Sequence, residues 1–268
     1  MGVSNILVGL SRLMPGLAAQ LSKSGRGALA ERLLSARLRV AAEQGDTATL
    51  GQLHGKIWAG ERGAKFHATK PASRLQFFTD NYAAEVTPVI DALLSDAAFD
   101  LQAIVDLGCG DGQVLGYLDD RFDLPPSIGI DISAEAIEMA KAAFADRPKL
   151  TFHHADMRRT LETHVQPNCL VMTHAGVLEY FTSAEVDELI AGLAEKAPVE
   201  VLLVEPLAGG FEMRDSNDLA SIVFGRESSF SHNYIGKFRA GGFTINKVTE
   251  IPLRNFPRLA VISASKRS

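Results

Sequence analysis

Residues 105–112 read Val-Asp-Leu-Gly-Cys-Gly-Asp-Gly, an apolar run that ends in an acid and passes into a turn with three glycines. This order predicts a buried strand, a tight turn and the start of a helix, because glycine adopts the positive φ angles that such a turn needs. Backbone N–H groups at a helix start have no partner within the helix, so a ligand can lie against bare main chain there. The turn is therefore the first candidate for a binding site.

From about residue 102 onward, short β-rich runs alternate with helical runs, which is the pattern of a parallel sheet covered on both faces. Predicted strands cover residues 103–107, 127–131, 149–154, 168–173, 199–204, 243–251 and 258–264. Predicted helices start near Asp111, Ser133, Arg158 and Ser183, and further helical segments lie near 215–225 and 231–240. The last two strands are joined across 252–257, with a proline at each end, and should form an antiparallel edge. We therefore predict an α/β fold, a doubly wound seven-stranded sheet that is mostly parallel, with an antiparallel C-terminal strand.

Helical periodicity covers most of the first 94 residues. Predicted helices cover residues 6–21, 28–43, 47–58 and 73–94, and Asp46 can cap the third of them. The first helix is amphipathic; its apolar face could lie on a membrane or a partner subunit, but we expect it to pack on the protein's own body. Residues 56–72 mix glycines with charged and aromatic residues, which indicates a loop or lid. Residues 1–72 should thus form a helical N-terminal cap with a lid.

Composition limits the possible partners. The chain has 268 residues and a formal net charge of −5, from 27 Lys and Arg against 32 Asp and Glu, so it lacks the positive field that collects nucleic-acid phosphates. No run approaches the roughly 18 apolar residues of a membrane span, and two cysteines without ligand-like spacing indicate a reducing compartment. His153 and His154 have no third ligand at a recognisable spacing, so we expect no metal site. We predict a soluble, cytoplasmic protein that binds neither nucleic acid nor membrane.

The glycine turn could in principle hold a nicotinamide dinucleotide. That fingerprint needs a third glycine at position 113, where this chain has Gln113. Asp106 and Asp111 also flank the turn, and two carboxylates repel a pyrophosphate. They suit a ligand that carries an ammonium or sulfonium group.

On these residues, the stretch 105–112 resembles motif I of the class I, Rossmann-like methyltransferases that depend on S-adenosylmethionine (SAM). The resemblance covers roughly residues 100–265 and includes 176–181, Gly-Val-Leu-Glu-Tyr-Phe. The fourth strand departs from the family, because Asn168-Cys169-Leu170-Val171 stands where an acid between apolar residues is usual. The first 100 residues match only the family's tendency to place a variable substrate cap there. The resemblance implies that residues 73–268 form the SAM-binding domain.

Two further acids follow the second and third predicted strands. Asp131 stands 25 residues after Asp106, close to the roughly 20-residue step between a glycine turn and an acid that binds ribose hydroxyls. Asp156 stands another 25 residues on, where the resemblance implies an acceptor for the adenine amino group, with Met157 beside it. Singly these acids could be helix caps or turn formers. The predicted cofactor-binding residues are Asp106, Gly108, Cys109, Gly110, Asp111, Asp131, Ile132, Asp156, Met157 and His174.

Candidate catalytic residues lie at the ends of later strands. His174 ends the fourth strand, at the carboxyl edge where open α/β sheets bind ligands, and a histidine can take a proton from a nucleophile near neutral pH. It is equally a polar residue that closes a strand. Tyr180 and His232 are weaker catalytic candidates. The predicted substrate-binding residues are Trp58, Phe66, Tyr82 and Tyr234, and Cys109 is interpreted as a small apolar residue beside the cofactor.

These observations predict a SAM-dependent methyltransferase that acts on an O, N or C nucleophile of a small molecule, such as a natural-product intermediate. The Asp/Asn-Pro-Pro-aromatic motif of amino methylation is missing, with Thr173-His174-Ala175-Gly176 near that place, and so is the Pro-Cys nucleophile of cytosine methylation. One alternative is a SAM-binding enzyme that catalyses a non-methylating reaction. The other is a non-catalytic binding protein that uses its N-terminal helices for dimerisation. For the methyltransferase, too, the N-terminal helices could form a homodimer.

Overall fold

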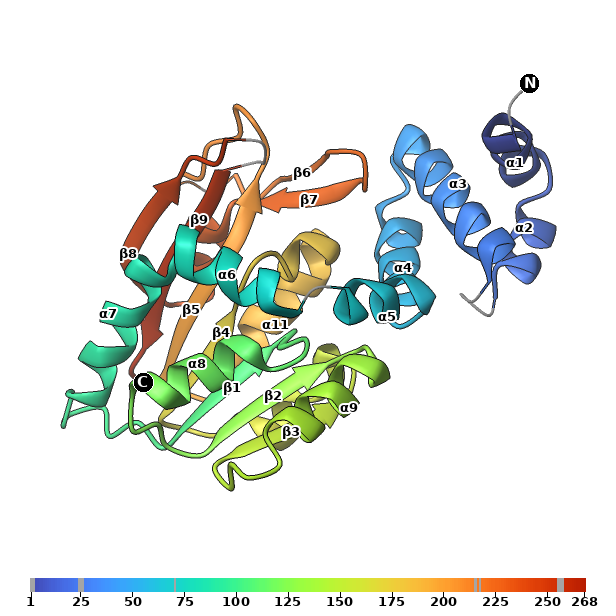
Figure 1. Cartoon of the computed structure of the whole chain (residues 1–268). Coiled ribbons are helices and arrows are strands. Elements are labelled where there is room, and N and C mark those ends of the chain that lie inside the picture. The colour runs from blue at the N-terminus through green and yellow to red at the C-terminus, as the bar shows by residue number, and fades with distance from the viewer. Residues whose placement is uncertain (1–2, 24–26, 70, 215, 217, 255–257) are drawn as a thin grey trace.

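The computed structural model describes residues 3–23, 27–69, 71–214, 216, 218–254 and 258–268. Its centre is a seven-stranded sheet of order β3-β2-β1-β4-β5-β9-β8 (Figure 1). The strands are β1 (Ala103–Leu107), β2 (Ser127–Asp131), β3 (Leu150–His154), β4 (Cys169–Thr173), β5 (Val199–Leu207), β8 (Thr244–Ile251) and β9 (Arg258–Lys266). The first five are parallel, and β9 lies antiparallel between β5 and β8. The predicted fold is confirmed, although Pro257, in the predicted link, lies outside the described residues.

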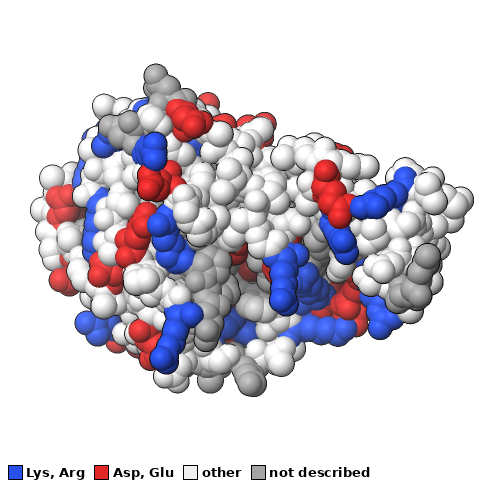
Figure 2. Space-filling view, turned by 90° about the horizontal axis from the view of Figure 1, so that it is seen from above, with Lys and Arg blue, Asp and Glu red and all other residues white. Residues whose placement is uncertain are grey.

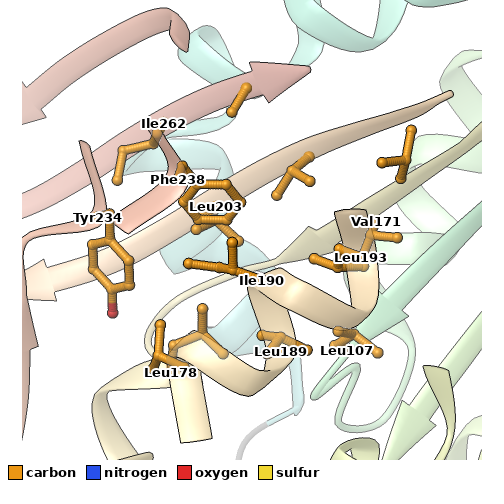
Figure 3. Packing of buried hydrophobic residues seen from close by; sticks show 14 of the residues in the cluster. Leu107, Val171, Leu178, Leu189, Ile190, Leu193, Leu203, Tyr234, Phe238 and Ile262 are labelled. Atoms are coloured by element: carbon orange, nitrogen blue, oxygen red, sulfur yellow. The ribbon is translucent and has the colours of Figure 1, made fainter. Parts of the chain in front are cut away.

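Helices cover both faces of the sheet, as a doubly wound fold requires. One face packs against α10 (Leu161–His164), α11 (Ser183–Ala194) and α12 (Tyr234–Ala240). Figure 3 shows Leu189, Ile190 and Leu193 of α11 against strand residues of this core. The other face packs against α6 (Pro71–Asn81), α7 (Ala83–Leu94), α8 (Gln113–Arg121) and α9 (Ala134–Ala143). The carboxyl ends of the parallel strands are left open between these two layers.

The N-terminal helices extend to one side of the sheet (Figure 1). They are α1 (Val3–Leu13), α2 (Pro15–Leu21), α3 (Ala28–Gln44), α4 (Thr47–Trp58) and α5 (Glu61–Ala68). The predicted helical N-terminal region is confirmed, and Asp46 caps α4 by accepting from Thr49 N at 3.0 Å. Pro15 begins a new helix within predicted helix 6–21, because proline cannot continue the α1 hydrogen-bond ladder.

Four local predictions need correction. The segment 56–72 was expected to be a loop, but it contains α5. The expected helix over 73–94 is two helices that separate at Tyr82, the N-cap of α7. The expected helix near 215–225 is instead strand β6 (Ser221–Phe224), which pairs with β7 (Ser229–His232); residues 215 and 217 lie outside the described ones. Of the helix expected over 231–240, only 234–240 is helical. The β6–β7 hairpin reaches toward the N-terminal helices (Figure 1).

Candidate functional site

A cavity of about 960 Å³ opens at the carboxyl ends of β1, β2 and β4. Its floor is the glycine turn after β1, and its outer walls come from α4, α5 and the turn between β6 and β7. The N-terminal cap therefore closes over the strand ends, where open α/β sheets bind their ligands.

The glycine turn keeps its main chain bare. Gly108, Gly110 and Gly112 have φ angles of +75°, +57° and +74°, which residues with side chains rarely adopt. A Cβ atom on Gly108 would lie 2.6 Å from Val177 Cγ2. Asp131 fixes the turn from the next strand, since its Oδ2 accepts from Gly110 N at 2.9 Å and its Oδ1 accepts from Ser133 N at 2.7 Å. The glycine turn after β1 and the acid at the end of β2, which the sequence marked separately, thus lie in direct contact.

Asp106 and His174 lie close together behind this turn. The Asp106 carboxylate is fully buried and does not line the cavity, whereas His174 does; His174 Nε2 lies 3.3 Å from Asp106 Oδ2. Burial disfavours a charge on His174, but the negative charges of Asp106, Asp111 and Asp131 outweigh it and raise the pKa of this histidine. At neutral pH the ring is therefore more readily protonated than an exposed histidine, which weakens it as a proton acceptor.

Two other predicted carboxylates are paired with arginines. Asp111 forms an ion pair with Arg74 of α6, so its charge is partly neutralised and less available to a cationic ligand than the sequence interpretation assumed. Asp156 accepts two hydrogen bonds from Arg158: Nε donates to Oδ1 at 2.8 Å, and Nη2 donates to Oδ2 at 2.7 Å. Burial opposes ionisation of Asp156, but the guanidinium of Arg158 lowers the pKa of this acid. Both acids line the cavity, but neither is free of a partner.

The remaining predicted cofactor residues follow the expected placement. Ile132 and Met157 line the cavity and supply apolar surface. Cys109 also lines it, and its thiol is buried; burial raises the pKa well above the usual range, so the thiol is not a ready nucleophile.

Aromatic side chains wall the outer half of the cavity. The ring of Trp58 in α4 lies 5.0 Å from that of Tyr180 and 5.3 Å from that of Phe66 in α5, centroid to centroid. The Tyr180 hydroxyl donates to Glu227 Oε2 at 3.1 Å, in the turn between β6 and β7. Tyr82 also lines the cavity. Four residues predicted from the sequence therefore line the same cavity.

Three predicted site residues do not line the cavity: Asp106, which lies behind the glycine turn, and His232 and Tyr234. The ring nitrogens of His232 contact Ser221 Oγ at 2.6 Å and Leu178 O at 3.1 Å, and burial lowers the pKa of His232 to about 4. Tyr234 is fully buried in the core on the α11 side (Figure 3). Both residues hold the fold together, because β7 and α12 direct these side chains into the protein.

Sequence reasoning missed an acid at the end of the fifth strand. Glu205 of β5 is fully buried and accepts from Thr173 Oγ1 at 2.7 Å and from the backbone N–H groups of Val177 and Leu178 at 3.0 Å each. It thereby shapes the short 3₁₀ helix η2 (Leu178–Tyr180), which carries Tyr180 to the cavity wall. A single glutamate that follows the apolar run 201–204 was the available signal. Also missed were His67 and Arg74, both of which line the cavity.

Thermal stability should fall as the pH rises from about 6.5 to about 8.5. Burial raises the pKa of Glu205 to about 7, and burial with the charge of Glu205 raises that of Glu179 to about 8. Both values exceed the ordinary 4.5, so the folded chain retains protons that the unfolded chain has released, and the free energy of unfolding falls through this window. Thermal unfolding measured at pH 6.5 and at pH 8.5, the two ends of this roughly two-unit window, gives the size of the fall. The variant Glu179→Gln should show a smaller fall, and an unchanged fall would contradict the assignment.

The described part of the chain contains neither a membrane-spanning helix nor a cluster of metal-ligating side chains. No described helix combines the length and apolarity needed to cross a bilayer. Among the described residues, no three His, Cys, Asp or Glu side chains gather as a metal site would require.

Comparison with known proteins gives the same picture for the centre of the chain. A family described as "Methyltransferase domain" matches residues 104–196. The methyltransferase ungE′ of Aspergillus campestris is 32% identical over 100 residues, which are 36% of this chain and 29% of that protein. This chain thus matches less than a third of its relative's length.

Two solved methyltransferase structures have a similar fold. A SAM-dependent methyltransferase of Leishmania major has a TM-score of 0.54 at 16% identity, over 78% of this chain and 84% of that one. The sugar N-methyltransferase KedS8 of Streptoalloteichus has a TM-score of 0.50 at 15% identity, over 74% and 92%. Identities this low establish the fold alone. The chain therefore has the fold of these methyltransferases, and its residues 104–196 match the methyltransferase-domain family.

Proposed function

We propose that the chain transfers a methyl group from SAM to a small molecule held in the cavity above the glycine turn. The observation that carries the proposal is the turn itself, where three glycines at positive φ leave bare main chain beside the carboxylate of Asp131. Both Asp131 oxygens keep further lone pairs for ribose hydroxyls. Met157 and Ile132 offer apolar surface to the adenine ring. The residues present therefore fit an adenosyl ligand.

SAM supplies a methyl group that its sulfonium already activates for in-line displacement. The chain's own task is to orient the acceptor and to exclude water. Trp58, Phe66 and Tyr180 suit that task, because they form an apolar wall contributed by separate elements. We place the acceptor against this wall, with an O, N or C nucleophile facing the turn.

A residue that lines the cavity would remove the proton from the methyl acceptor. His174 lines the cavity at the end of β4, but its raised pKa leaves the ring less often free to accept a proton at neutral pH than an ordinary histidine. Glu179 also lines the cavity, and its pKa of about 8 lets it accept a proton at mildly alkaline pH. Activity on a hydroxyl or amine acceptor should therefore increase toward alkaline pH.

The proposal is tested by incubating the chain with methyl-labelled SAM and a metabolite library. The expected result is S-adenosylhomocysteine (SAH) together with a product heavier by one labelled methyl group. SAM consumption without such a product would favour the non-methylating alternative, and no SAM or SAH binding by calorimetry would favour a binding protein without catalysis.

The distribution of surface charge bears on the choice of partner. Acidic and basic side chains lie side by side over the face seen in Figure 2, which is unlike the continuous basic surface of a nucleic-acid-binding protein. We therefore propose a small-molecule acceptor, such as a natural-product intermediate, and a cytoplasmic enzyme.

A homodimer through the N-terminal helices is also proposed. Leu13 is 85% exposed, and Ile6 and Met14 beside it are more than half exposed, an arrangement that apolar burial against a second copy would stabilise. We expect Leu13→Asp to shift a dimer toward monomer in sedimentation experiments, with SAH affinity unchanged. A monomeric wild-type chain at high concentration would rule out the dimer.

A further inference from the structure

The turn between β6 and β7 is fixed to the rest of the cavity wall. Glu227 of this turn forms an ion pair with Arg62 of α5 and accepts from the Tyr180 hydroxyl at 3.1 Å. The next residue, Ser228, is buried, and its carbonyl oxygen lies 3.1 Å from Nε2 of His54, a buried residue of α4. Elements that are far apart in the sequence thus hold the turn, which has a defined place at the cavity, unlike a free hairpin tip.

This turn brings an aromatic ring and a cation to the cavity. Phe224, the last residue of β6, and Arg226, two positions further on, both line it. They belong to the same outer wall as the rings of Trp58, Phe66 and Tyr180. Aromatic rings supply apolar surface, and a guanidinium binds oxyanions through its fork of N–H donors. A wall with both suits a ligand that has an apolar body and an anionic end.

No acid among the described residues neutralises Arg226. The other described arginine and lysine side chains that line the cavity each have an acidic partner: Arg62 with Glu227, Lys65 with Glu61 and Glu31, Arg74 with Asp111, and Arg158 with Asp156 and Glu185. Arg226 is exposed and forms no hydrogen bond or ion pair with any residue that the structure describes. Glu179 also lines the cavity, but its pKa of about 8 leaves it mostly uncharged at neutral pH. The outer wall therefore keeps a positive charge that an anion on the ligand could meet.

We propose that the methyl acceptor is an aromatic or other apolar molecule with an anionic group, a carboxylate or a phosphate, and that Arg226 binds this group. The anion lies at the outer wall of the cavity, so the nucleophile at the other end of the molecule faces the glycine turn. The inference rests on the proposed function and names its substrate class. Arg226 then determines specificity by binding the acceptor and takes no part in methyl transfer itself.

A matched pair of fluorescent probes tests the inference in the SAH-loaded protein. 8-Anilinonaphthalene-1-sulfonate carries a negative charge, whereas N-phenyl-1-naphthylamine has the same rings without it. Trp58 is the single tryptophan of the chain and lines the cavity, so energy transfer from Trp58 reports a probe bound there. We expect Arg226→Gln to bind the sulfonate about fivefold more weakly than the wild type, and the neutral probe within about twofold.

Two further variants separate charge from structure. Arg226→Lys keeps the positive charge and should retain part of the sulfonate affinity. Arg254→Gln is the matched control, because Arg254 is an exposed arginine that does not line the cavity; it should bind both probes as the wild type does. Equal loss of both probes in Arg226→Gln, or no loss of either, would overturn the inference.

Competition against the bound sulfonate distinguishes the two anions. The competitors are 1-naphthoate, 1-naphthyl phosphate and the neutral 1-naphthamide. At least one anion should displace the probe from the wild type more readily than the amide does and should lose that advantage in Arg226→Gln; the stronger competitor identifies the group. Two anions that compete no better than the amide would contradict the inference. A wild-type chain that binds these probes but neither SAM nor SAH in calorimetry would instead contradict the proposed function.

Discussion

Replacing Asp131 with alanine should lower the affinity for SAH by about a hundredfold or more. The carboxylate would lose its ribose contacts, each a hydrogen bond to a charged group worth about 1.5–3 kcal/mol. The backbone N–H groups of Gly110 and Ser133 would also lose their acceptors, so the turn would be less well ordered before the ligand arrives. Calorimetric titration with SAH measures the loss.

Asp123→Ala is the control for this change. Its side chain is 95% exposed and pairs only with Lys149 at the surface, where an ion pair contributes little. It should bind SAH as the wild type does. Unchanged affinity in Asp131→Ala would remove Asp131 from the cofactor site.

Replacing Glu205 with alanine should destabilise the chain by about 3 kcal/mol, which lowers Tm by about 6–12 °C for a chain of this size. The change leaves the Thr173 hydroxyl and the N–H groups that begin η2 without their buried acceptor. Because η2 carries Tyr180, the aromatic wall of the cavity should loosen as well. Differential scanning calorimetry gives the stability, and Tyr180 resonances in NMR spectra report on the wall.

A conservative and a remote variant complete this test. Glu205→Gln keeps one oxygen acceptor and should lose less stability than the alanine variant. Glu212→Ala removes an exposed acid paired with Arg214 and should leave Tm within about 1 °C of the wild type. An alanine variant as stable as wild type would show that the Glu205 hydrogen bonds add nothing to the fold.

The sheet could be predicted from the sequence because its strands have a strong local signal. Buried parallel strands are continuous apolar runs, and the glycines and acids that end them lie at fixed places. Strand β6 lacked such a signal. Its run Ser221–Phe224 is short, and it becomes a strand because it pairs with β7, which periodicity alone does not reveal. His232 and Tyr234 were misplaced for the same reason, since the start of α12 depends on that hairpin.

The candidate site could be predicted where its residues follow strand ends, as Asp131 and His174 do. It could not be predicted where two distant segments meet. Arg74 reaches Asp111 across 37 positions of sequence, and His67 lies in a segment whose glycines and charges indicated a loop. Helix α5 is held by packing and by the Arg74 contacts, so its register and the direction of His67 depend on tertiary structure.

The position of β9 leaves one edge of β5 unpaired while the chain is being synthesised. This strand follows β8 in sequence, yet it pairs with β5 on one side and β8 on the other. All nine residues of β5 are buried in the finished sheet, so during translation its edge is an open apolar template until β9 emerges from the ribosome. Nascent chains at that stage, and truncated chains that end before Arg258, should therefore be prone to aggregate.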